Sequence, residues 1–294
     1  MILLLILIIL ILLVVLLYVL AIMPRLSNAK AMQPFVGVLF AHRGLYDNAA
    51  GIPENSLAAF KRAVEAGYGV ELDVQLTRDR IPVVFHDYTL RRMARYDKGA
   101  ESEGAAINED GSFGVPGLLS DYTYAELKQF HLLNTSERIP LFTDVLKLVQ
   151  GRVPLLVEIK SEDSDMTVCE KTQRILRAYG GKYLVESFNP LVLNWYRAHA
   201  DRVVRGQLSE AFVKEDQKYS GIKYKVLENL LLNFLSKPDF IAYNHKYADN
   251  LSLRLCLSLF RARAAYYTVR TQEELDRLRR GGSMVIFEGF VPDR

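Results

Sequence analysis

Short apolar runs alternate with amphipathic stretches along residues 35–294, and this alternation constrains the possible fold more than any other feature of the chain. Strands are predicted at residues 35–41, 70–76, 83–86, 153–160, 183–188, 203–208, 240–243, 265–269 and 284–287. Helices are predicted between most of them, at residues 56–66, 124–133, 141–150, 166–179 and 271–280. Strand–helix alternation over about 260 residues is typical of a parallel (β/α)8 barrel, the TIM barrel.

The predicted strands number one too many for such a barrel, and the linker at residues 77–80 identifies the extra one. These four residues join the strands at 70–76 and 83–86 and are too few for a crossover helix. The two strands are therefore predicted to pair as an antiparallel hairpin. The hairpin would fold His86 back beside Glu71 and Asp73.

The first 23 residues form an apolar run interrupted only by the hydroxyl of Tyr18. As a helix the run would cross a hydrocarbon core of about 30 Å. It lacks the basic region of a secretory signal, so we expect a retained single-pass anchor, followed by a linker at 24–34 and one domain at 35–294. Cleavage near Ala29 and Ala31 is the alternative. Arg25 and Lys30 follow the run and no basic residue precedes it, which weakly favours a cytoplasmic domain.

Composition narrows the functional classes. A net charge of +3 in 294 residues does not suggest a nucleic-acid-binding protein. Cys169 and Cys256 lie far apart and form no disulfide framework, which fits either side of a membrane. Gly, Ser, Asn and acidic residues concentrate at 96–120, where we expect a long loop.

Three acidic residues are candidate metal ligands. Glu71 and Asp73 lie two residues apart on a predicted strand, so their carboxylates project from the same face and repel one another unless a cation lies between them. Glu158 follows an apolar strand and could supply a third carboxylate to a divalent cation. Two alternatives stay open: ordinary exposed acids on a surface hairpin, and a salt bridge between Glu158 and Lys160 at the barrel rim.

Two histidines stand at strand ends within the same stretch of acids. His42 and His86 are therefore candidates for an acid/base pair rather than structural residues. His131 and His199 are expected on helix surfaces. His245 follows the strand at 240–243 and is a candidate to line the substrate pocket.

Arg43 directly follows His42 and could grip two phosphate oxygens, with Gly44 permitting the sharp turn after it. The residues Pro53, Glu54, Asn55 and Ser56 are typical of a helix start. We expect Asn55 or Ser56 to cap the helix, and capping would account for Asn55. Glu54 is expected to orient Arg43 or a metal-bound water.

Five motifs in this order resemble the glycerophosphodiester phosphodiesterase family: HRG at 42–44, PENS at 53–56, ELDVQLTRD at 71–79, VVFHD at 83–87 and VEIK at 157–160. The resemblance implies a TIM barrel of the phospholipase C-like phosphodiesterase type, with a small insertion at about 87–140. It implies His42 and His86 as the acid/base pair, and Arg43 and Lys160 as phosphate contacts. It also implies a Ca²⁺ or Mg²⁺ cofactor held by three ligands, Glu71, Asp73 and Glu158.

The C-terminal end departs from the family pattern. Members commonly have Trp-Thr-Val-Asn where this chain has Tyr267-Thr268-Val269-Arg270, and an Asp-rich final strand where this chain has Glu288. These positions shape the substrate pocket, so the resemblance leaves the substrate less defined than the reaction.

The expected function is therefore metal-dependent hydrolysis of glycerophosphodiesters to glycerol 3-phosphate and an alcohol by two-histidine catalysis. One alternative is a phospholipase D-like activity on lysophospholipids or other membrane lipids, favoured by the anchor and by four aromatic residues, Tyr243, Tyr247, Tyr266 and Tyr267. Another is a catalytically inactive membrane-tethered binding module. Loss of a motif histidine or acid would indicate this last alternative, and none is lost.

Overall fold

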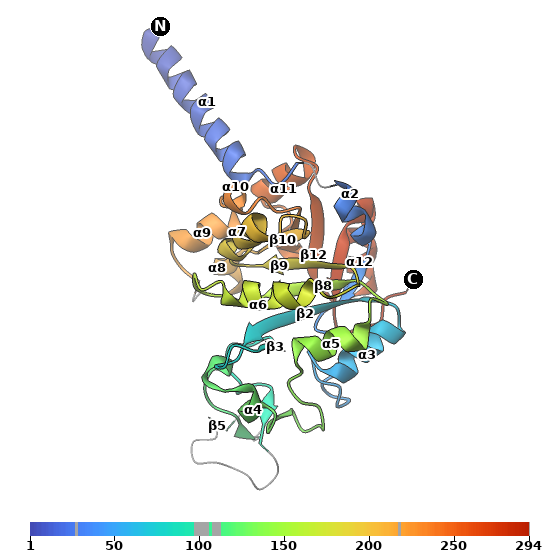
Figure 1. Cartoon of the computed structure of the whole chain (residues 1–294). Helices are drawn as coiled ribbons and strands as arrows, with labels where there is room; N and C mark the ends of the chain where they lie inside the picture. Colours follow the sequence, from blue (N-terminus) through green and yellow to red (C-terminus); the bar gives the residue numbers. More distant parts are fainter. Residues whose placement is uncertain (27–28, 97–105, 108–112, 217–218, 294) are drawn as a thin grey trace.

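The fold is a closed parallel barrel, seen in a computed structural model that describes residues 1–26, 29–96, 106–107, 113–216 and 219–293 (Figure 1). Eight parallel strands surround the core, and the first of them pairs with both the second and the last. In order around the barrel they are β1 (Leu39–Ala41), β2 (Gly69–Leu76), β8 (Leu155–Ile159), β9 (Tyr183–Ser187), β10 (Arg205–Ser209), β11 (Phe240–Asn244), β12 (Arg263–Val269) and β13 (Met284–Phe287). The TIM-barrel prediction is confirmed.

The predicted hairpin is also confirmed. Strand β3 (Pro82–Val84) pairs antiparallel with β2, with Val74 opposite Val84 and Leu76 opposite Pro82. A four-residue connection leaves no room for a crossover helix, so the chain reverses direction and β3 lies outside the barrel.

Helices cover the outside of the barrel. They are α3 (Leu57–Glu65), α5 (Phe142–Val149), α6 (Thr167–Leu176), α7 (Pro190–His199), α11 (Leu251–Ser258) and α12 (Gln272–Leu278). Their apolar faces form one buried cluster with outward-facing strand residues. The cluster includes Phe60, Val145 and Tyr196 from the helices and Leu155 and Val185 from the strands. Three short helices, α8 (Phe212–Glu215), α9 (Ile222–Glu228) and α10 (Asn233–Ser236), lie in the connection from β10 to β11.

The residues that face the barrel interior change from apolar to ionisable along the strands. Near the strand starts they are apolar and form a second core cluster, which includes Phe40, Leu156, Leu184 and Ile286. Because side chains on a strand alternate between faces, the next inward positions are His42, Glu158, Glu186 and Glu288. The barrel interior is therefore apolar at one end and ionisable at the mouth, where the carboxyl ends of the strands meet.

Two predicted elements were wrong in part. Only Leu39–Ala41 of the strand expected at 35–41 is a strand, because Gly37 has a φ of 71° and a short 3-10 helix, η1 (Gln33–Phe35), precedes it. The helix expected at 124–133 ends early, as α4 (Tyr124–Leu127), and is followed by strand β7 (His131–Leu132). His131 is thus half-buried on a strand and not on a helix surface.

The loop expected at 96–120 contributes two strands to a small antiparallel sheet. That sheet comprises β4 (Ala94–Arg95), β5 (Ala106–Ile107), β6 (Phe113–Gly114) and β7. Residues 97–105 and 108–112 of the expected loop lie outside the described part of the chain. The apolar residues of the insertion, including Leu90, Val115 and Leu132, form a cluster with Phe85, and this packing overrides the polar composition of the segment.

Helix α1 (Ile2–Ile22) is long and apolar enough to cross a membrane, and a signal sequence would pass the same test. It projects from the barrel near α10 and α11 (Figure 1). Its last turn is part of the fold: Ile22 is fully buried and the Ile22 carbonyl accepts from Asn233 Nδ2 at 2.9 Å. Residues 24–34, expected as a linker, include the short helix α2 (Ala29–Met32), and Met32 is buried against the starts of the barrel strands.

Candidate active site

Three carboxylates meet inside the barrel mouth. Glu71 and Asp73 project inward from β2, and Glu158 projects from the neighbouring strand β8, where it pairs in register with Asp73. One oxygen of each lies within 4.8 Å of the others, and all three side chains are buried. Oxygens bound to Ca²⁺ at about 2.3–2.6 Å can be this far apart, so the donor set fits a hard divalent cation.

The positive charges around the three carboxylates do not compensate for their burial and mutual repulsion, so the three do not ionise independently. Burial raises the pKa of Glu71, and the charges of Asp73 and Glu158 raise it further. Burial also raises the pKa of Glu158, although Lys160 opposes the shift. Burial alone would raise the pKa of Asp73, but Lys160, His86 and Arg43 outweigh it and hold that pKa well below its usual range. A bound divalent cation would allow all three to be ionised together.

Lys160 bridges two of these carboxylates. Its Nζ lies 2.8 Å from Glu158 Oε1 and 3.1 Å from Asp73 Oδ1. The Glu158–Lys160 salt bridge that the sequence left as an alternative is therefore present. It does not account for Glu71, which forms no ion pair within the described residues and accepts a hydrogen bond from the backbone N–H of Arg43 at 2.8 Å. A buried carboxylate without a cationic partner is the feature that a metal ion would satisfy.

The Arg43 guanidinium is held beside the cluster. Its Nη1 donates to Glu54 Oε1 at 2.8 Å, and its Nε lies 3.7 Å from Asp73 Oδ2. The expected orienting contact between Glu54 and Arg43 is thus formed. Gly44 turns the chain with a φ of 83°, and a Cβ at this position would lie 2.8 Å from the backbone of Ala59, so only glycine fits.

The expectation that capping accounts for Asn55 was wrong. Ser56 is the helix N-cap, since its Oγ accepts from the backbone N–H of Ala59 at 3.1 Å. Asn55 has a φ of 54° and donates from Nδ2 to Asp73 Oδ2 at 2.8 Å. Its amide therefore fixes the orientation of a candidate metal ligand.

Each candidate histidine has a carboxylate at its Nδ1. His42 Nδ1 lies 2.5 Å from Glu288 Oε2, and His86 Nδ1 lies 2.7 Å from Asp87 Oδ1. A carboxylate at Nδ1 favours the tautomer protonated there, which leaves Nε2 as the nitrogen that can exchange a proton. Burial and the nearby Arg43 lower the pKa of His42, although Glu288 opposes this shift.

An arginine completes each pair. Glu288 also binds Arg270 and accepts from the Tyr46 hydroxyl at 3.1 Å. Asp87 accepts from Arg92 Nε at 2.6 Å. The two histidines thus have similar partners, although those of His42 lie near the other end of the barrel sequence and those of His86 are local. Glu288 was noted in the sequence only as a departure from the family pattern, and its contact with His42 was missed.

Glu186 was also missed. It lies on β9, in register with Glu158, and is buried with an Oε2 that has no hydrogen-bond partner within the described residues. Burial raises its pKa well above the usual range, and the charges of Glu158 and Asp73 raise it further. The available signal was its spacing: Glu186 follows the inward apolar Leu184 by two residues, as Glu158 follows Leu156.

The other histidines lie elsewhere. The His245 ring is buried, with Nε2 at 3.2 Å from the Thr268 carbonyl and 3.9 Å from Glu274, so its contacts are to β12 and α12. A substrate contact by His245 stays a prediction. His199 is exposed at the end of α7 and stacks on Trp195, in agreement with a surface position.

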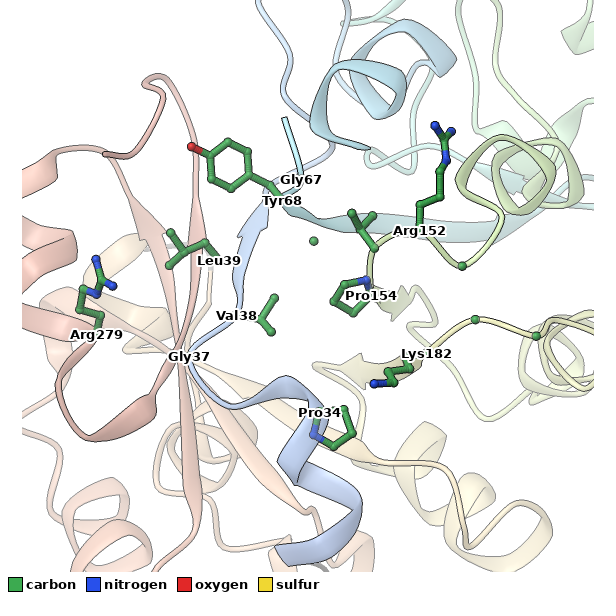
Figure 2. A pocket seen from close by; sticks show the side chains of 15 residues that line it. Pro34, Gly37, Val38, Leu39, Gly67, Tyr68, Arg152, Pro154, Lys182 and Arg279 are labelled. Carbon is green, nitrogen blue, oxygen red and sulfur yellow. The ribbon is translucent and has the colours of Figure 1, made fainter. Parts of the chain in front are cut away.

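A pocket of about 570 Å³ lies at the other end of the barrel. It is lined by residues that precede the strands, among them Val38, Pro154 and Lys182. Figure 2 shows Lys182 directed into this pocket, with the guanidinium groups of Arg152 and Arg279 far apart in the view. The pocket is separate from the carboxylates and histidines at the mouth.

Cationic groups beside an acidic cluster can bind a phosphodiester, and two histidines can transfer the protons of its hydrolysis. The mouth of this barrel therefore fits a phosphodiesterase. The sequence profile of the glycerophosphoryl diester phosphodiesterase family matches residues 42–291. The chain belongs to this family, which is one of phosphoric diester hydrolases. The expected family, fold and enzyme class are confirmed.

Similar proteins agree with this assignment. A glycerophosphodiester phosphodiesterase of Bacillus altitudinis is 35% identical over 133 residues, which cover 43% of this chain and 45% of that protein. One from Caldanaerobacter subterraneus is 30% identical over 190 residues, covering 60% of this chain and 69% of that protein. A phosphodiesterase of Oleispira antarctica, solved in complex with the product sn-glycerol-3-phosphate, shares the fold with a TM-score of 0.63 and 23% identity, over 88% of this chain and 94% of that one.

Proposed function

We propose that this protein hydrolyses glycerophosphodiesters to glycerol 3-phosphate and an alcohol, with His42 and His86 as the acid/base pair. The observation that carries the proposal is the buried acidic cluster, flanked by Arg43 and Lys160 and by two carboxylate-paired histidines. The names of the relatives and the glycerol 3-phosphate in the Oleispira antarctica structure support the same substrate class.

Glu71, Asp73 and Glu158 would hold the divalent cation, Ca²⁺ or Mg²⁺. When bound, this ion supplies positive charge opposite the phosphoryl oxygens and neutralises the mutual repulsion of its ligands. Arg43 and Lys160 add a guanidinium and an ammonium, both of which remain charged at neutral pH because the surrounding carboxylates raise their pKa values against the effect of burial. These groups stabilise the charge that builds on phosphorus as the ester reacts.

The two histidines would move the protons. One removes the proton from the 2-hydroxyl of the glycerol moiety, whose oxygen then attacks phosphorus. The bond from phosphorus to the leaving alcohol breaks, and the other histidine protonates that alcohol. Water then opens the cyclic phosphate with the histidine roles reversed, which yields glycerol 3-phosphate. Glu288 and Asp87 hold the ring tautomers that this exchange requires.

Lysophospholipids are a second candidate substrate class, and helix α1 favours them. A tethered domain meets membrane lipids at high effective concentration. One relative, the lysophospholipase D GDPD1 of Rattus norvegicus, is 23% identical over 80% of this chain and 76% of that protein. An inactive binding module is disfavoured, because the candidate acids and histidines lie together at the mouth.

Helix α1 is proposed to remain on the mature protein as a membrane anchor. Cleavage near Ala29 or Ala31 would remove Ile22 from a buried position and leave Asn233 Nδ2 without the carbonyl it binds. The hydroxyl of Tyr18 also binds Ser252 Oγ at 2.7 Å. These contacts support retention of the helix. Arg25 and Lys30 weakly favour a cytoplasmic barrel.

The test is a turnover assay with full-length protein in detergent or vesicles. Two products are followed, glycerol 3-phosphate from a panel of soluble glycerophosphodiesters and lysophosphatidic acid from lysophospholipids, with Ca²⁺, with Mg²⁺ and with a chelator. Metal-dependent release is expected, and the Glu71→Gln variant is the control for contaminating activity. Absence of both products with either metal would overturn the proposal.

A further inference from the structure

Helix α1 leaves the barrel at its mouth end. Tyr18 contacts Ser252 in the first turn of α11, and the Ile22 carbonyl accepts from Cys256 Sγ one turn further along that helix. Helix α11 follows the carboxyl end of β11 and runs back toward the strand starts. Beyond it, the Met23 carbonyl accepts from Lys237, which lies shortly before β11. The two helices therefore run side by side in the same direction, and residues before Tyr18 extend past the mouth end.

Exposed apolar side chains lie on the helices next to this exit. Phe234 on α10, which packs against α1, is 50% exposed, and Leu251 at the start of α11 is 60% exposed. Ile222 at the start of α9 is 81% exposed, and the exposed Lys223 follows it. We name Ile222, Phe234 and Leu251, with Lys223, the anchor-side surface. Helices α10 and α11 lie at the base of α1 (Figure 1), and the end of α9 is joined to the start of α11 by the contact of Asn250 with the Glu228 carbonyl.

The length of α1 sets where the bilayer begins. Twenty-one helical residues span about 32 Å, and the hydrocarbon core takes about 30 Å. The last turn of α1 packs in the barrel domain and leaves about 17 residues before it, the lower limit for a membrane-spanning helix. The bilayer boundary therefore falls close to Tyr18, a residue type that favours the interface. Phe234 and Leu251 flank that turn. Exposed apolar side chains at this depth are stabilised by burial in the headgroup layer, and the neighbouring Lys223 can bind anionic lipid headgroups.

We propose that the anchor-side surface lies in the headgroup layer, so that the mouth of the barrel opens toward the membrane surface. The inference rests on the retention of α1 proposed above. Of the two substrate classes proposed above, this orientation favours the lysophospholipids, because their headgroup ester can reach the carboxylates while the acyl chain stays in the bilayer. Soluble glycerophosphodiesters gain nothing from this orientation.

Depth-dependent quenching tests the surface without any reference to catalysis. Single cysteines are introduced into the full-length chain as Ile222→Cys, Phe234→Cys and Leu251→Cys, labelled with an environment-sensitive fluorophore and reconstituted in vesicles that contain spin-labelled phospholipids. The native Cys169 and Cys256 are buried and stay unlabelled. Leu259→Cys is the matched control, since Leu259 is 57% exposed at the opposite end of the same helix as Leu251.

Quenching at the three surface positions, and little at Leu259→Cys, is expected. Equal quenching at Leu251→Cys and Leu259→Cys, or none at Leu251→Cys and Phe234→Cys, would overturn the inference. An intact mass that shows a chain lacking residues 1–23 would overturn it together with the anchor. If no phosphodiesterase activity were found, the quenching pattern would still show whether the anchor-side surface lies in the headgroup layer. Failure of the proposed function and failure of this inference are therefore distinguishable.

Substrate preference supplies the second measurement. Leu251→Gln should lower turnover of a lysophospholipid in vesicles about threefold or more relative to a soluble glycerophosphodiester. Leu259→Gln should leave that ratio unchanged. A neutral side chain is used in both variants so that the helix dipole does not distinguish them. Equal ratios in the two variants, with lysophospholipid turned over, would contradict the inferred substrate class.

Discussion

Replacing Glu288 by glutamine removes one negative charge beside His42 while keeping the shape of the side chain. Glu288 accepts from His42 at 2.5 Å and from Tyr46 at 3.1 Å, and it binds Arg270. If Glu288 positions His42 and stabilises its protonated form during turnover, the variant should lose activity through kcat. The KM should change little, because Glu288 acts through His42 and not on the substrate.

The size of the loss follows from the contact. A hydrogen bond to a charged group contributes about 1.5–3 kcal/mol, and each 1.36 kcal/mol of activation free energy changes the rate about tenfold. Glu288→Gln should therefore lower kcat about 10- to 150-fold. The charge of Glu288 also raises the pKa of His42 against burial and Arg43, so its removal should lower that pKa further. One limb of the pH–kcat profile should move to lower pH: the acidic limb if His42 is the base, the alkaline limb if it is the acid.

Tyr46→Phe is the matched control. It removes one hydrogen bond to Glu288 but leaves the carboxylate on His42, so kcat should fall less than about threefold. The assay is steady-state turnover of a glycerophosphodiester from pH 5 to 9 with saturating metal. A Glu288→Gln enzyme with wild-type kcat and unmoved pH limbs would refute the positioning role.

The same variant has a stability signature. The hydrogen bond and charge of His42, with Arg270, overcome burial and lower the pKa of Glu288 to about 2, from an ordinary value of 4.5. A lowered folded-state pKa stabilises the protein above the ordinary value, and this contribution is lost as pH falls from 4.5 toward 2. The wild-type Tm should therefore fall more steeply than that of Glu288→Gln over this interval.

Three further predictions concern the acids, the histidines and the anchor. Removing any one of the three candidate metal ligands, by Glu71→Gln, Asp73→Asn or Glu158→Gln, should abolish turnover while the fold survives. With chelator present, Glu71→Gln should keep or raise the Tm, because it relieves carboxylate repulsion. A variant that retains most of its activity at saturating metal would not have lost a ligand. His42→Ala and His86→Ala should each lower kcat by about a hundredfold or more, and the double variant should be scarcely worse than either. Nitrophenyl-type esters, whose leaving group needs no proton, should restore the activity only of the variant that lacks the acid. Equal restoration in both variants would contradict separate roles for the two histidines. Ile22→Ala should lower the free energy of unfolding by about 2–5 kcal/mol, whereas Ile9→Ala, which changes an exposed residue of the same helix, should leave the Tm of the barrel unchanged.

Much of the fold was predictable because its signals are local. The strand–helix alternation, and a connection of four residues that excludes a crossover, sufficed for the barrel and the hairpin. The spacing of Glu71 and Asp73 placed both on one face, because side chains on a strand repeat every two residues. Local patterns failed at His131, where packing within the insertion made a strand of a segment with helical character.

The sequence by itself determined the class of fold, the pairing of the hairpin and the identity of the inward acids on β2 and β8, since each depends on spacing within a few residues. Only the tertiary structure brought Glu288 to His42 across 246 positions, because β1 and β13 become neighbours when the barrel closes. The tertiary structure likewise placed Glu186 beside Glu158. It also brought Asn55, which was expected to cap a helix, into a hydrogen bond with Asp73. It also buried the end of α1 against α10 and α11. Such contacts depend on the register between strands distant in the chain, which no local pattern of residues encodes.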